Sequence, residues 1–116
     1  MKAFDFDSAK IKHSLWSSRL RSFIYGDMAL ENELNKNEHE CGLGKWIDTN
    51  TVTLQKSSVF KKLQEIHTNI HEHTQKIIAL SKQEKDFVIL LENYKDYEVE
   101  MKQLLALLDE MKKEWV

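Results

Sequence analysis

Residues 87–115 read FVILLENYKDYEVEMKQLLALLDEMKKEW, a stretch without glycine or proline in which apolar residues recur every three or four positions. This spacing predicts a long helix with one apolar face, because residues three and four apart lie on the same side of a helix. The expected seam consists of Phe87, Leu91, Tyr94, Met101, Leu105, Leu108 and Trp115.

The same helix carries more apolar residues than one seam needs. The additional ones stand at Leu104 and Leu107, beside Met101, Leu105 and Leu108, and this surplus favours self-association. The solvated face is expected to carry Glu98, Glu100, Lys112 and Lys113.

The rest of the chain has few residues that favour turns, since it lacks proline and has glycine only at positions 26, 42 and 44. We therefore predict an all-α protein. A first helix should begin near Asp7 or Ser8 and stop at Gly26, with an inward stripe. The stripe reads His13, Trp16, Leu20, Phe23 and Ile24.

Three further segments follow before the last helix. Residues 27–40 indicate a partly helical connector, and a short helix should run from about Cys41 to between Asp48 and Asn50. Residues 51–58 indicate a turn into a third long helix capped by Ser57 or Ser58, with a possible break near 81–84. The core positions of that helix are Val59, Leu63, Ile66, Ile70 and Ile77. The economical arrangement is a single domain, residues 1–116, folded as a four-helix bundle with a short helix that bears Cys41.

Composition excludes several classes of protein. The chain of 116 residues has a formal net charge of −2, with no basic patch of the kind that binds nucleic acid. It has no apolar run long enough to span a membrane and no secretory signal, so we expect a cytoplasmic protein. One cysteine cannot form an internal disulfide, which leaves the thiol idle, reactive or metal-bound.

Four residues form the most suggestive chemical set in the sequence: His13, Cys41, His67 and His71. Three imidazoles and one thiolate are the number and type of ligands that close a tetrahedral zinc site. His67 and His71 are one helical turn apart, so both rings lie on one face. Each residue also has an ordinary structural interpretation, as a hydrogen-bonded histidine or a buried thiol.

The surroundings of Cys41 strengthen the zinc interpretation. Backbone N–H groups at the start of a helix favour the thiolate form. Gly42 and Gly44 would let the backbone approach the histidine helix closely, and Trp46 would pack beneath. His39 and His73 are expected to stay off the metal, His39 in the polar connector and His73 in solvent.

The chain resembles the chemoreceptor zinc-binding domain family of bacteria from about residue 8 to 115. The resemblance rests on three spaced motifs: His13-Ser14-Leu15-Trp16, Cys41-Gly42-Leu43-Gly44-Lys45-Trp46 and His67-Thr68-Asn69-Ile70-His71. It implies one zinc ion per chain held by the four residues above, with Trp16, Leu43, Gly44 and Trp46 supporting the site. It also implies a homodimer in a signalling system, where such domains report zinc or hypochlorous acid to a chemoreceptor or a diguanylate cyclase.

The sequence ends at Val116 with no signalling or cyclase domain, so we expect either a free-standing regulator of a partner protein or a fragment of a longer one. We expect no enzyme activity, because four protein ligands leave no position for water or substrate. Cys41 is the expected redox switch. Two other interpretations stay open: an interaction bundle with a purely structural zinc, and a hemerythrin-like iron protein, which would need inward carboxylates.

Overall fold

The computed structural model describes residues 4–83 and 87–115, and every regular element in these ranges is helical. The predicted all-α class is therefore confirmed for the described part of the chain. The elements are α1 (Phe6–Ile24), the 3-10 turn η1 (Met28–Leu30), α2 (Glu31–Leu34), α3 (Gly42–Asn50), α4 (Ser58–Gln83) and α5 (Phe87–Trp115).

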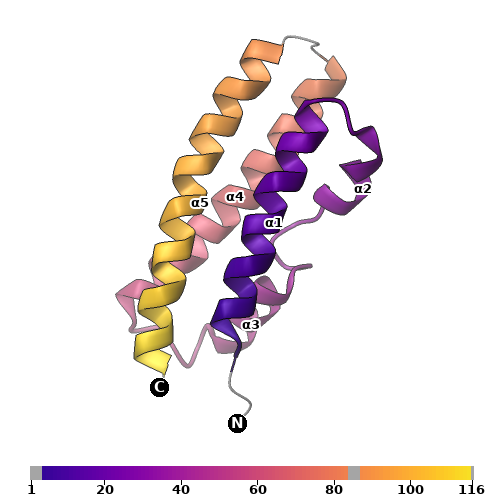
Figure 1. Ribbon diagram of the computed structural model, residues 1–116. Helices are drawn as coiled ribbons and strands as arrows, with labels where there is room; N and C mark the ends of the chain where they lie inside the picture. The colour runs from indigo at the N-terminus through magenta and orange to yellow at the C-terminus, as the bar shows by residue number, and fades with distance from the viewer. Residues whose placement is uncertain (1–3, 84–86, 116) are drawn as a thin grey trace.

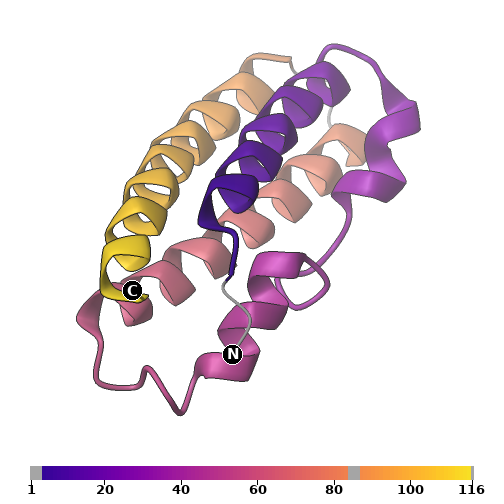
Figure 2. The same cartoon turned by 60° about the horizontal axis from the view of Figure 1, so that its bottom comes forward.

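Three long helices, α1, α4 and α5, lie side by side and give the molecule its extents of 46 × 22 × 21 Å (Figure 1). Helix α5 packs along both α1 and α4 and runs antiparallel to them. The short helices α2 and α3 contact α4 on the remaining side, with α3 near the start of α1 (Figure 2). A fourth long helix is absent from the described residues, so the exact four-helix bundle is not confirmed; α2, α3 and their connections take that place.

The ends of the helices agree in part with the ends predicted from the sequence. Helix α1 starts at Phe6, before the predicted start near Asp7 or Ser8. The expectation that Asp7 or Ser8 caps it is wrong, because Asp5 is the cap and accepts a hydrogen bond from the Ser8 backbone N–H at 2.9 Å. Its end at Gly26 is confirmed, where the backbone adopts a φ of +119°. Ser57 caps α4 as predicted, since its hydroxyl accepts from the Phe60 N–H at 3.1 Å. The expected break near 81–84 partly falls outside the described residues.

The seam of α5 differs from the predicted one. Its buried residues are Leu90, Tyr94, Tyr97, Met101, Leu104, Leu108 and Met111, which alternate steps of four and three. Tyr94, Met101 and Leu108 were predicted correctly, whereas Leu91 and Leu105 lie beside the seam and Phe87 is 40% exposed. The side chain of Trp115 lies outside the described residues.

The surplus leucines of α5 do not form a second exposed stripe. Leu104 and Leu108 are buried, and Leu105 and Leu107 are half-buried against the core. Self-association therefore stays a prediction without support from this face. In the described part of the chain, no helix is long and apolar enough to cross a membrane.

Candidate metal centre

Three separate segments bring the four predicted ligands together. His13 comes from the inner face of α1, Cys41 from the residue before α3, and His67 and His71 from adjacent turns of α4. One ligand atom of each lies within 4.8 Å of the others, and this is the one such group of His, Cys and acidic side chains found in the described residues.

Two of the histidines are oriented by backbone carbonyl groups. The Nδ1 of His13 lies 2.8 Å from the Ala9 carbonyl oxygen, one turn earlier on α1. The Nδ1 of His71 lies 3.0 Å from the Lys36 carbonyl oxygen in the connector after α2. If each Nδ1–H donates to its carbonyl, each Nε2 keeps a free lone pair for a metal.

Cys41 meets His67 directly. The Cys41 Sγ lies 3.0 Å from the His67 Nε2, and the backbone N–H of Gly44 donates to the same sulfur at 3.3 Å. The sulfur therefore serves as the N-cap of α3 while it faces the histidine helix. Loss of this side chain would affect the helix start and the cluster together.

Burial controls the protonation of all four groups. His13, His67 and His71 are 7%, 1% and 2% exposed, and burial lowers the pKa of each, that of His67 to about 2. Burial also raises the pKa of the Cys41 thiol, more than the N–H groups of Gly44 and Leu43 lower it. The imidazoles are therefore neutral and ready to bind a metal, whereas the thiol would release its proton on binding.

The raised pKa of Cys41 contradicts the expectation that the start of α3 favours the thiolate form. The contact between the helix start and the sulfur is present as predicted, but it does not make the thiolate the preferred form in the metal-free protein.

Trp16 forms a wall of the cluster. Its ring lies 5.3 Å from that of His71 between centroids, and its indole N–H donates to the Thr74 hydroxyl at 3.2 Å. The Thr74 hydroxyl in turn donates to the Ile70 carbonyl. Thr74 was not predicted, although its position three residues after His71 places it on the same helix face.

The glycine expectations are partly wrong. A Cβ on Gly44 would lie 1.5 Å from the Glu38 carbonyl oxygen, so the close approach is to the connector and not to the histidine helix. A Cβ on Gly42 would meet nothing within 4 Å. Gly44 therefore lets the connector pass over α3, and this fixes the segment that supplies the Lys36 carbonyl.

Leu43 and Trp46 pack at the end of the molecule where α1 begins, which is the bottom of Figure 1. Leu43 is buried, and the half-buried Trp46 ring stacks on Phe4 at 4.9 Å and meets the edge of Phe6 at 5.3 Å. Trp46 thus anchors α3 to the start of α1 through an aromatic cluster.

The two remaining histidines lie outside the cluster. His39 is exposed and pairs with Asp48 at 2.8 Å, a contact that raises its pKa. The side chain of His73 is 18% exposed and lies 2.6 Å from Glu100, so the prediction that His73 is solvated is wrong. The side chain of Glu100, expected on the solvated face of α5, is only 21% exposed. This pair joins α4 to α5.

The residues fit a zinc ion. The ligands of a tetrahedral zinc lie about 3.3–3.6 Å apart, given Zn–N and Zn–S bonds of about 2.0–2.3 Å. The four atoms, within 4.8 Å of one another, need only small movements to reach that spacing. A di-iron site would require bridging carboxylates, and the cluster contains none.

Comparison with known proteins agrees with this chemistry. The family model described as chemoreceptor zinc-binding domain matches residues 13–78, a stretch that begins at the first candidate ligand and includes all four. No curated protein and no solved structure matches the chain.

Proposed function

The chain belongs to the chemoreceptor zinc-binding domain family, and from this premise we propose that it is a zinc-binding regulatory module that reports metal or oxidant to a partner protein. The observation that carries the proposal is the convergence of His13, Cys41, His67 and His71 within 4.8 Å. One zinc per chain would be held by these four side chains.

The closed ligand set favours regulation over catalysis. Catalytic zinc usually has three protein ligands and an open position for water, whereas a fourth ligand completes a structural or sensory site. A bound zinc would link α1, the connector and α4 through its bonds to ligands from each of these segments. Its gain or loss would therefore change how firmly these three segments are held together.

Cys41 is the proposed point of oxidation. Its thiolate sulfur would attack the chlorine of hypochlorous acid and displace hydroxide. Water would then hydrolyse the S–Cl bond to give Cys–S–OH, chloride and a proton, so that the sulfur loses two electrons and the oxidant gains them. A sulfenic acid is a poorer ligand than a thiolate, so the start of α3 would separate from His67. The movement of α3 and the connector is the proposed signal, and a homodimer that acts on a chemoreceptor or cyclase is its proposed context.

Replacement of Cys41 tests this function. Serine can still cap α3 through its hydroxyl, so Cys41→Ser should stay folded. Zinc affinity should fall by more than about 100-fold, which exceeds the loss seen when only a hydrogen-bond partner of a ligand is removed. Zinc binding is measured by competition with a chromogenic chelator, and zinc release is followed on addition of hypochlorite.

The parent protein should bind one zinc and release it with hypochlorite in step with Cys41 oxidation measured by mass spectrometry. Equal zinc affinity in the parent and Cys41→Ser would contradict the site. Zinc that stays bound after Cys41 has been oxidised would contradict the switch.

The buried position of the cluster favours a second candidate, a purely structural zinc. Such an ion would keep full occupancy at every oxidant level that leaves the helices folded. The hypochlorite titration therefore separates the two functions, since only a sensor loses zinc before its circular dichroism signal changes.

A further inference from the structure

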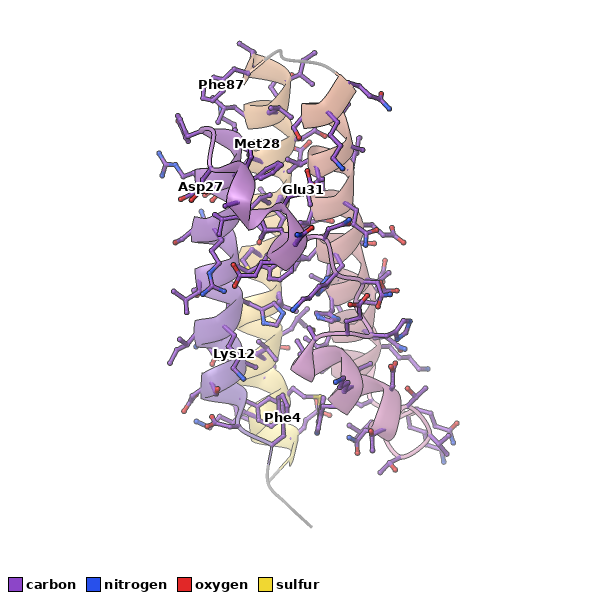
Figure 3. All side chains as sticks on the ribbon, turned by 90° about the vertical axis from the view of Figure 1, so that its right-hand side faces the viewer. Phe4, Lys12, Asp27, Met28, Glu31 and Phe87 are labelled. Carbon is purple, nitrogen blue, oxygen red and sulfur yellow. The ribbon has the colours of Figure 1, made fainter. Side chains whose placement is uncertain are left out.

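A groove of about 690 Å³ lies beside the metal centre, between α1 and the segment 36–43. Figure 3 views this face, with Lys12 labelled on the lower half of α1, Phe4 labelled just before the start of that helix, and α3 across from them. His13, Cys41 and His71 reach its inner wall. The volume is in the range of small-molecule sites, about 300–1,000 Å³.

The sides of the groove are apolar. Phe4, Leu15, Trp16 and Leu43 line it, and Leu15 is 48% exposed although its neighbours on the inner side of α1 are buried. Apolar surface that remains in contact with water favours an occupant with an apolar part.

Two lysine side chains of the groove are available to an anion. Lys12 and Lys36 line it, and neither has an ion pair in the described part of the chain. Arg19 also lines the groove but pairs with Glu33 at 3.2 Å, and Asp5 and Glu40 accept hydrogen bonds from backbone N–H groups and keep their negative charge.

The backbone adds a second feature of the same sign. Gly42, the first residue of α3, lines the groove, and the space over its Cα is open. The start of a nine-residue helix carries a partial positive charge that attracts anions, although the N–H groups of Leu43 and Gly44 already face the Cys41 sulfur. Lys12 therefore contributes positive charge from the α1 wall, and Lys36 and this helix start contribute it from the opposite wall.

We propose that this groove binds an amphipathic organic anion, a carboxylate on an apolar tail, with the carboxylate held by Lys12 and Lys36 and the tail against Leu15, Trp16 and Leu43. The bound molecule covers Cys41 and slows its oxidation; this second consequence rests on the function proposed above. The ligand does not bind the metal, because the four protein ligands already complete its coordination.

Calorimetry on the full zinc-loaded chain tests binding, with octanoate and octylammonium as probes of equal tail length. Octanoate should bind saturably at one per chain and at least about tenfold more tightly than octylammonium. The double variant Lys12→Gln/Lys36→Gln should weaken octanoate by about tenfold, and Lys45→Gln, an exposed lysine outside the groove, should not.

The apolar contact is tested with a matched pair on α1. Leu15→Asp should abolish octanoate binding, whereas Ile11→Asp should leave it unchanged, because Ile11 is 62% exposed and does not line the groove. Both variants are checked for folding by circular dichroism. Absence of saturable octanoate binding, or equal binding by the two variants, would overturn the proposal.

The protection of Cys41 is measured separately. Saturating octanoate should slow hypochlorite oxidation of Cys41 by about tenfold in the parent protein and not at all in Leu15→Asp. An unchanged rate in the parent would overturn the shielding. Octanoate binding without zinc binding would leave the groove site standing and refute the proposed function, and zinc binding without octanoate binding would do the reverse.

Discussion

Gly44 is in close contact with the connector, whereas the space beside Gly42 is open, so substitutions at the two glycines should have different effects. The Cβ of an alanine there would overlap the Glu38 carbonyl oxygen at 1.5 Å, so the connector would have to move. We expect Gly44→Ala to lower the free energy of unfolding by about 1–3 kcal/mol, the usual cost of overpacking. Zinc affinity should fall as well, because the displaced connector carries the carbonyl that orients His71. Urea melts and zinc titrations measure both effects.

Gly42→Ala is the matched control, since its added methyl group would meet no atom within 4 Å. It should leave zinc affinity unchanged and should not destabilise the fold, because alanine favours a helical position over glycine. Equal destabilisation by the two substitutions would show that Gly44 has no special steric role.

Individual residues also show what a sequence can and cannot predict about a site. The four candidate ligands could be chosen from their chemistry and spacing, because His67 and His71 share a face on any straight helix. The carbonyls of Ala9 and Lys36 could not be chosen in the same way, since every residue has one. Ala9 could have been considered, because it precedes His13 by one turn; Lys36 depends on the path of an irregular connector.

Helix α5 shows the same limit for a whole element. Its existence and length follow from periodicity, yet the predicted seam included Leu91 and Leu105, which lie one position after the buried Leu90 and Leu104. Runs of adjacent leucines fit two neighbouring stripes equally well, so periodicity alone does not choose between them. The choice is made by packing against α1 and α4, which the sequence of α5 does not contain.

The two leucines of α5 give a direct test of the seam. Leu104 is fully buried and Leu105 only half-buried. We expect Leu104→Ala to cost about 2–5 kcal/mol of unfolding free energy and Leu105→Ala less than half as much, because the cost follows the buried volume that is lost. Urea melts of the two variants measure the difference. A larger loss at Leu105 would restore the seam predicted from the sequence.

At the level of the whole molecule, the metal centre lies where three segments meet: α1, the start of α3 and α4. Helix α5 packs along both α1 and α4, and the ligands of α1 and α4 face each other on the side where the connector and α3 lie. The sequence could indicate three long helices and a short one, but not that α2, α3 and their connections complete this side. Their position depends on contacts such as those of Gly44 and Trp46.

Three buried neutral imidazoles in this position link the stability of the metal-free protein to pH. Burial lowers the pKa of His13, His67 and His71, whereas an unfolded histidine has a pKa of about 6.5. Below about pH 6.5 the unfolded chain therefore takes up protons that the folded chain does not. The stability is complete above that pH and falls as the pH is lowered. At about pH 5.5, His67 alone, with its pKa of about 2, should remove about 1.4 kcal/mol.

Urea melts of chelator-treated protein between about pH 7.5 and 5.5 measure this loss. His67→Gln should make the decline shallower by about one proton, because a group that titrates only in the unfolded chain has been removed. His39→Gln should not make it shallower, since His39 is exposed and its pKa is raised, which gives a pH dependence of the opposite sign. A free energy of unfolding that is equal at the two ends of the range would mean that the histidines are not held neutral in the folded protein. The metal centre would then lack the buried, deprotonated imidazoles that make it ready to bind zinc.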